Sequence, residues 1–157
     1  MQTLNIHDRF TLLCPEGFRS LTEEESDKLY TLGAGDSLFL TNEEAHIIVS
    51  IGWNDVNVVA GLLLHLISPV TSVEANVSKA MIPFGYKKET MLERTIGGQP
   101  AQGFRYTYMA EGTPMVGESY VIRQGRSLTF FHAYLRAELR AESLPLWQAL
   151  LDAVEAK

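Results

Sequence analysis

Between Tyr86 and Leu135, polar and apolar residues tend to alternate in four runs, which are separated by glycine-containing turns. The runs are Tyr86–Ile96, Ala101–Ala110, Met115–Arg123 and Ser127–Leu135, and the turns contain the sequences GGQP, EGTP and QGR. A period of two is typical of strands with one buried face, and short glycine turns join antiparallel neighbours. This region therefore predicts a meander of four antiparallel strands, which constrains the fold more than any other feature.

The glycines in TIGGQPAQGFRYTY, residues 95–108, also raise the question of phosphate binding. A phosphate loop leads a glycine-rich turn into a helix N-terminus, where backbone N–H groups and the helix dipole meet the anion. Here a period-two run follows the turn, which predicts a strand, and the stretch contains no GxGxxG motif. We therefore expect Gly97 and Gly98 to form a hairpin turn, and we expect no cofactor.

The first half of the chain mixes strands and helices. The sequence RFTLLCPEGF predicts a strand with Phe10, Leu12 and Cys14 on one side. Thr22 and Glu25 have the spacing of a capping box, which predicts a short helix. The segments 37–41 and 46–53 predict a hairpin with the turn NEE.

Three longer segments predict helices: 55–67 capped by Asp55, 68–81 capped by Ser68, and 143–157 capped by Ser143 with Pro145 in its first turn. Their expected buried stripes are Val59, Leu62, Leu63 and Leu66; Val70, Val73, Val77 and Met81; and Leu144, Trp147, Leu151 and Val154. We find no linker or repeat, so we expect one α+β domain over residues 1–157, with a central antiparallel sheet of about six strands packed by helices.

The late strands place many aromatic residues on one sheet face if both late turns are three-residue loops. That face would carry Phe104, Tyr106, Tyr108, Glu118, Tyr120, Ile122, Phe130, His132 and Tyr134, and the opposite face Thr107, Met109, Ser119, Val121, Phe131, Ala133 and Leu135. One interpretation is that the aromatic face is core beneath the helices. The other is that helices cover the opposite face, so that Tyr106, Tyr108, Tyr120, Phe130, His132 and Tyr134 form a partner-binding surface.

The residues do not predict a catalytic or metal site. His7, His46, His65 and His132 are not spaced three or four apart, and neither CxxC nor HExxH occurs, so we expect no metal. GxSxG is missing, and the lone Cys14 is typical of a small buried hydrophobe. We expect no enzyme; a hydrolase using His132 beside Glu118 stays a weaker alternative.

Charge and hydropathy narrow the choice of partners. The net charge is −6 and only Lys87 and Lys88 are adjacent cations, which argues against a nucleic-acid partner. The most apolar run, Val58–Ile67, is shorter than the roughly 20 residues of a membrane-spanning helix. With one cysteine and a polar N-terminus, we expect a cytoplasmic protein, and exposed strand edges are compatible with a homodimer.

Two passages resemble the PsbP/Mog-like α+β family, which includes bacterial DcrB-like proteins. FTLLCPEGFRSLTEEE is similar to the family's opening strand and Pro-x-Gly-Phe turn, and the strands from Thr95 to Glu138 with the closing helix are similar to its second half. The resemblance implies an antiparallel sheet packed by helices and a role in binding proteins, as in a photosystem subunit, a Ran-binding protein and chaperones of secretion effectors. It transfers no catalytic motif.

These observations predict a non-enzymatic, cytoplasmic protein-binding module with an unidentified protein partner, such as a chaperone or adaptor for secretion effectors. The alternative is a protein that binds a small apolar ligand between the sheet and the segment GLLLHL, residues 61–66.

Overall fold

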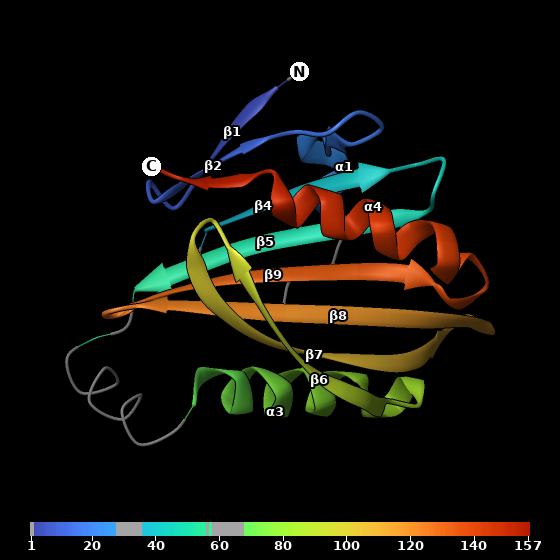
Figure 1. The fold of residues 1–157 in the computed structure, drawn as a ribbon. Helices are drawn as coiled ribbons and strands as arrows, with labels where there is room; N and C mark the ends of the chain where they lie inside the picture. Colours follow the sequence, from blue (N-terminus) through green and yellow to red (C-terminus); the bar gives the residue numbers. More distant parts are fainter. Residues whose placement is uncertain (1, 28–35, 56, 58–67) are drawn as a thin grey trace.

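The computed structural model describes residues 2–27, 36–55, 57 and 68–157, and its centre is a seven-stranded antiparallel sheet of order β3-β4-β5-β9-β8-β7-β6 (Figure 1). Its strands are β3 (Arg19–Ser20), β4 (Asp36–Asn42), β5 (Ile47–Asp55), β6 (Lys87–Ile96), β7 (Gln99–Ala110), β8 (Thr113–Gln124) and β9 (Ser127–Arg136). A smaller sheet of order β1-β2-β10 contains β1 (Thr3–Ile6), β2 (Phe10–Leu13) and β10 (Val154–Ala156). The predicted α+β class with a central antiparallel sheet is confirmed.

Helices lie on both sides of the central sheet. They are α1 (Glu23–Asp27), α3 (Pro69–Met81) and α4 (Arg140–Asp152), with 3-10 turns η1 (Ile82–Phe84) and η2 (Ala137–Leu139). One face of the sheet packs against α3, and the other packs against α4 and the small sheet (Figure 1). We call these the α3 face and the α4 face. None of these helices is long and apolar enough to cross a membrane, a finding that covers the described residues only.

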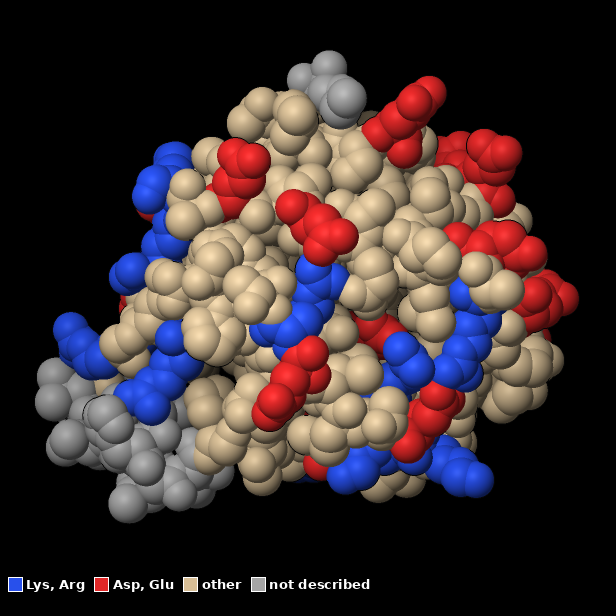
Figure 2. All heavy atoms as spheres, viewed as in Figure 1, with Lys and Arg blue, Asp and Glu red and all other residues tan. Residues whose placement is uncertain are grey.

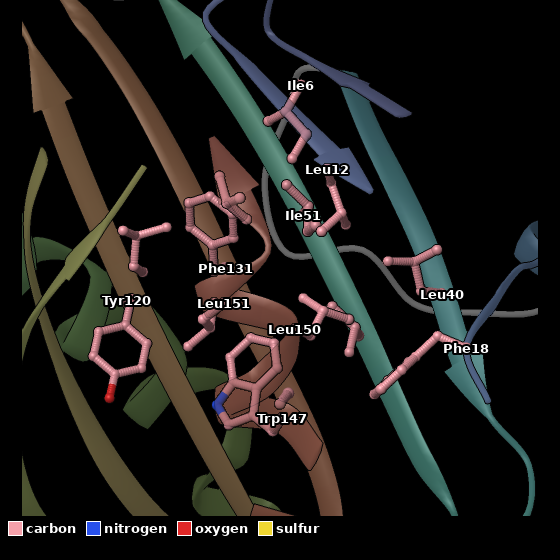
Figure 3. Close-up of a cluster of buried hydrophobic side chains, with 14 of the residues drawn as sticks. Ile6, Leu12, Phe18, Leu40, Ile51, Tyr120, Phe131, Trp147, Leu150 and Leu151 are labelled. Carbon is pink, nitrogen blue, oxygen red and sulfur yellow. The ribbon is translucent and has the colours of Figure 1, made fainter. Parts of the chain in front are cut away.

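The larger core lies on the α4 face. Trp147, Leu150 and Leu151 of α4 are fully buried and point toward the sheet beside Phe131 (Figure 3). Ile6 and Leu12 of the small sheet join the same cluster, as do Phe10 and Val154. Because β10 pairs with β2, the C-terminus is fastened to the N-terminal hairpin, and the two ends of the chain close one side of this core.

The four-strand meander is confirmed, but its turns are shorter than expected. Gly97 and Gly98, with φ of 58° and 77°, form a two-residue turn, since Ile96 pairs directly with Gln99. The next two turns also contain two residues, because Ala110 pairs with Thr113 and Gln124 with Ser127. Such turns follow the twist of the strands they join and need positive φ at one or both positions.

The turn lengths correct the predicted sheet faces. A shift of one residue moves every side chain of a strand to the other face. Glu118, Tyr120 and Ile122 of β8 therefore lie on the α4 face, and Ser119 and Val121 lie on the α3 face, contrary to our prediction. Each of the two late turns is one residue shorter than predicted, and the two errors cancel at β9. The predicted grouping of the aromatic residues of β7 with those of β9 is therefore correct.

Most local predictions in the first half hold. In the capping box the Thr22 N–H donates to Glu25 Oε1 over 2.9 Å and the Glu25 N–H donates to Thr22 Oγ1 over 3.2 Å. The hairpin of β4 and β5 is present, and the predicted helix at 68–81 is α3, with its valine stripe buried. Ser68 stands at the N-cap position, but its hydroxyl donates to Gln102 instead of capping the helix. The predicted helix at 55–67 lies outside the described residues, except that Asp55 ends β5.

The C-terminal helix begins earlier than predicted. Ser143 was expected as its cap, but α4 starts at Arg140, and the Ser143 hydroxyl donates to the carbonyl of Ala45 over 3.1 Å. Pro145 lies inside the helix rather than in its first turn. The chain also leaves the helix after Asp152, so Val154 is buried from a strand. Tertiary bonds to the β4–β5 hairpin and to β2 decide these ends.

Candidate functional site

The six residues predicted to bind a partner do not share one exposed surface. Tyr106, Tyr108 and His132 are buried on the α3 face, and Phe130 and Tyr134 are half-buried there; Tyr120 is buried on the α4 face. Tyr106 is only 1% exposed, beneath Val70, Val73 and Val77 of the same cluster. Their burial supports the interpretation of this face as core, and only the half-buried pair is open to a partner.

The tyrosine rings form a continuous layer under α3. The Tyr106 ring lies 5.3 Å from Tyr86 and 5.7 Å from Tyr108, measured between centroids. A Cβ atom at Gly117, opposite Tyr106 in the sheet, would lie 2.2 Å from Tyr106 Cζ, so the ring lies flat across this glycine. Burial raises the pKa of Tyr106 and Tyr108, and it raises the pKa of Tyr134 to about 12. These hydroxyls stay protonated at neutral pH and cannot act as bases there.

A serine and a histidine meet inside the same face. Ser119 Oγ lies 2.7 Å from His132 Nδ1, and the two side chains come from directly paired positions of β8 and β9. Burial lowers the pKa of His132 to about 4, and Ser119 is 0% exposed. A nucleophile needs access to its substrate, and a base with a pKa near 4 is weak at neutral pH. The pair is suited to filling the core with a satisfied hydrogen bond.

Glu118, which directly precedes Ser119 in the sequence, belongs to a different site. Glu118 is fully buried on the α4 face, whereas His132 lies on the α3 face, so the contact that the weaker hydrolase alternative needs is not formed. Its carboxylate accepts from Arg105 Nε over 2.6 Å and from Trp147 Nε1 over 3.0 Å. Arg105 stands directly opposite Glu118 in the sheet, and Gln148 adds a bond of 3.4 Å from α4. A buried carboxylate is tolerated where it is paired and bonded in this way.

This network extends to the surface through a second carboxylate. Glu89, which is bulged out of the pairing of β6 with β7, accepts from Arg140 over 2.9 Å and from Arg105 over 3.4 Å. The Arg140 guanidinium, with Arg105 further away, lowers the pKa of Glu89. Charged side chains of both signs alternate over β6 and α4 (Figure 2). Because the charges are mutually neutralised, the network stabilises α4 and offers little to an ionic ligand. A lone acid in the apolar run of β8 was the sequence signal for it.

The structure has a groove that the sequence did not indicate. It measures about 550 Å³ and lies between the β4–β5 turn, the β7–β8 turn and the end of β9. Its floor contains Ile48, Met115 and Tyr134, and its rim includes Glu43, Glu111 and Arg136. We call it the hairpin-end groove. Tyr134 is the one residue of the predicted partner surface that lines it, because the two turns and the residues beside them build most of the rest.

Sheet register brings the groove floor together. Ile48 pairs with Tyr134 across β5 and β9, and Met115 pairs with Arg136 across β8 and β9. Tyr134 faces Gly117, which faces Tyr106, so the groove floor continues into the buried tyrosine layer. The floor is therefore built on hydrogen-bonded strands and is largely apolar, which is the usual character of a preformed binding surface.

The surroundings of the groove are acidic. The charged residues that line the groove are Glu43, Glu111 and Arg136, which leaves one negative charge. Arg19 is shared between Glu25, at 2.9 Å, and Glu43, and the hydrogen bonds from Arg19 lower the pKa of Glu25 to about 2. Acidic side chains gather at the right-hand edge of the molecule, over the β4–β5 hairpin (Figure 2).

Three further features were considered from the sequence: the lone Cys14, a metal site and an apolar pocket. Cys14 is buried and its thiol donates to the carbonyl of Phe18 over 3.4 Å, while burial raises its pKa, so it packs as a small hydrophobe. No group of three or more potential metal ligands occurs among the described residues. The predicted apolar pocket against residues 61–66 falls outside them.

Comparisons with known proteins give a fold. No family model matches the chain, and no curated protein is similar to it in sequence. The structure is similar to the solution structure of cyanobacterial PsbP (CyanoP) from Synechocystis sp. PCC 6803, with a TM-score of 0.70 at 13% identity over 99% of this chain and 92% of that one.

Two further solved structures share the arrangement. PA94 from Pseudomonas aeruginosa, a protein of unknown function, has a TM-score of 0.54 at 13% identity over 97% of this chain and 94% of that one. LpqN of Mycobacterium tuberculosis, described as involved in cell envelope biogenesis, has a TM-score of 0.52 at 14% identity over 94% and 83%. The expected PsbP-like fold is confirmed, and at this identity the likeness speaks for the fold alone.

Proposed function

We propose that this chain, with its PsbP-like fold, is a non-catalytic module that binds another protein in the hairpin-end groove and acts as an adaptor or chaperone. One observation carries the proposal: a hollow of about 550 Å³ with an apolar floor and a charged rim stands at the end of the central sheet. The cytoplasmic location and the homodimer stay predictions from the sequence.

The shape and lining of the groove favour a protein segment over a small ligand. Ile48, Met115 and Tyr134 offer an apolar strip, and Tyr134 adds a hydroxyl to an otherwise apolar ring. Aromatic residues and methionine are enriched at the centres of protein interfaces, and a polar rim surrounds such centres. The opening lies between two hairpin turns, so an extended segment can lie along it.

Charge complementarity selects a basic segment. Glu111 forms no ion pair among the described residues, and Glu43 shares Arg19 with Glu25. A partner with lysine or arginine beside apolar residues would place its apolar side chains on the floor and its cations against this rim. Opposite potentials across an interface raise the association rate and disfavour acidic competitors.

The buried polar groups support the absence of catalysis. Ser119 and His132 are inaccessible, and Glu118 is committed to Arg105 and Trp147. The accessible carboxylates near the groove, Glu43 and Glu111, lie on turns, and the described residues that line the groove include no serine or cysteine. The geometry therefore supplies a binding surface without a set of reacting groups.

The proposal is tested by affinity purification from the native cell together with a defined peptide. The wild-type chain is compared with the groove variant Glu111→Lys/Met115→Lys and with the matched surface variant Glu155→Lys. We expect the wild type and Glu155→Lys to retain one stoichiometric protein that the groove variant loses by tenfold or more.

The peptide arm measures nuclear magnetic resonance shifts on titration with a nonapeptide that alternates lysine and leucine. Shifts centred on Ile48, Met115 and Tyr134 are expected, and a glutamate–leucine peptide should bind at least about tenfold more weakly. Equal binding of the two peptides, or retention of the stoichiometric protein by the groove variant, contradicts the proposal. The thermal midpoint of each variant is the control for folding.

A further inference from the structure

A second surface feature lies at the far end of α3. Ile82 and Phe84 of η1 are 66% and 51% exposed, with the exposed Pro83 between them. They are the most exposed large hydrophobic side chains of the described residues. We call Ile82 and Phe84 the apolar tip. It follows directly on α3 and precedes β6, where the chain turns at the sheet edge (Figure 1).

The local backbone holds the tip outward. Gly85 adopts a left-handed φ of 77°, and its N–H donates to the carbonyl of Ile82 over 3.1 Å. The Tyr86 N–H donates to the carbonyl of Met81 over 3.2 Å, so the turn closes on itself. The half-buried Tyr86 ring packs on Tyr106, which fixes the base of the turn to the sheet. The exposure of the tip is thus built into an ordered turn.

Lysines surround the tip. Lys79 lies one helical turn before Ile82, and Lys87 and Lys88 follow Phe84 at the start of β6; all three are exposed. Lys88 pairs with Glu74 over 3.2 Å, whereas no ion pair forms at Lys79 or Lys87 within the part of the chain that the structure describes. Basic side chains gather at the lower right edge, where α3 ends (Figure 2). This local charge contrasts with the net charge of −6 of the whole chain.

We propose that the apolar tip and its lysines dock the protein on an anionic lipid surface. Apolar side chains that enter the headgroup region, with lysines against the anionic lipids, are the usual elements of peripheral membrane binding. The tip is convex and offers two large side chains, whereas a stable protein interface needs about 800 Å² on each partner. Size and charge therefore favour a lipid surface over an acidic protein.

The orientation of the tip is compatible with the proposed groove. The tip lies at the end of α3 in an edge of basic charge, and the groove lies by the β4–β5 hairpin in an edge of acidic charge (Figure 2). An anionic membrane repels the acidic edge and attracts the basic one. The two proposals stand on separate residues and fail separately.

The test is co-sedimentation of the full chain with vesicles of phosphatidylglycerol and phosphatidylcholine, compared with phosphatidylcholine alone. We expect binding to the anionic vesicles at low salt only. The variant Ile82→Ser/Phe84→Ser should bind roughly tenfold more weakly, because the apolar contribution is lost. Lys79→Gln/Lys87→Gln should also lose most binding, since the attraction is then removed.

Matched variants at the opposite end of the molecule are the controls. Leu13 is 48% exposed on β2, and Leu13→Ser should leave binding unchanged; Lys157→Gln should do the same. A tryptophan in place of Phe84 should be quenched by brominated anionic lipid more strongly than a tryptophan in place of Leu13. Absence of sedimentation with anionic vesicles, or equal losses in the tip and control variants, overturns the proposal. So does a change of oligomeric state in the serine tip variant without vesicle binding, since the tip would then contact protein.

Discussion

The two faces of the central sheet are covered by helices of equal length, 13 residues each, but they are held in different ways. On the α4 face, Trp147 combines apolar burial with a hydrogen bond to the buried Glu118, and Ser143 bonds to the β4–β5 hairpin. On the α3 face, three valines lie on aromatic rings, and the polar links of α3 are at the surface. A paired buried charge fixes the position of one helix, whereas the other is held mainly by hydrophobic contact.

The largest effect is expected at Trp147. Trp147→Ala should lower the free energy of unfolding by about 5 kcal/mol, because it opens a cavity and removes one partner of the buried Glu118. Urea unfolding measures the loss. Trp147→Phe keeps most of the apolar contact and should lose less than half as much. Equal losses in the two variants would show that the hydrogen bond to Glu118 adds nothing to this face.

The matching change on the α3 face is Tyr106→Ala. It should cost about 4 kcal/mol through the cavity, less than Trp147→Ala, since no buried charge loses a partner. Urea unfolding is combined with the partner-retention measurement. Unchanged stability with loss of the partner would restore the interpretation of the tyrosines as an exposed binding surface. Tyr106→Phe, which keeps the ring over Gly117, is the control.

Acidic pH should lower the free energy of unfolding through His132, which is buried on the α3 face. Its pKa is about 4 in the folded protein and about 6.5 in the unfolded chain, so the unfolded chain binds a proton first as the pH falls. The contribution of the neutral His132 to the free energy of unfolding is fully present above pH 6.5. It is lost as the pH falls from 6.5 to 4, and the total loss is about 3 kcal/mol. Unfolding free energies from pH 7 to pH 4 measure this slope. In His132→Gln that part of the slope should disappear, and an unchanged slope would assign the acid sensitivity to other groups.

The smallest effects should separate the polar links of the two helices. Ser143→Ala removes a partly buried hydrogen bond to Ala45 and should cost about 1 kcal/mol. Ser68→Ala removes an exposed bond to Gln102 and should cost less than about 0.5 kcal/mol. Thermal and urea unfolding of the two variants give the comparison. A larger loss at Ser68 would contradict the view that α3 is held by apolar contact.

Local patterns predicted the elements of the meander and of α3 because their signals are contained within a few residues. The alternation around Tyr106, the valine spacing of α3 and the Thr22–Glu25 box all act between near neighbours, and the structure confirms them. The faces of β8 were predicted wrongly because turn length is a matter of one residue, and an error of one residue moves Glu118 and Tyr120 across the sheet.

The candidate site was less predictable than the fold. Tyr134 was named from its strand, but the hairpin-end groove also needs Ile48 and Met115, which are far apart in the chain. No local pattern marks residues that meet only when two turns close beside one strand end. The exposed tip was also missed, because Ile82 and Phe84 are apolar residues directly after the apolar stripe of α3, and only the turn that follows the helix directs them outward.

The sequence by itself determined the α+β class, the antiparallel meander and the strand that follows its first glycine turn, because backbone preference and residue periodicity act over short distances. Only the tertiary structure decided which face Glu118 occupies, where α4 begins and which apolar side chains stay exposed. These depend on contacts between distant segments, such as Ser143 with Ala45 and Trp147 with Glu118. Folding brings those segments together through the burial of a shared core, and no short stretch of sequence contains that information.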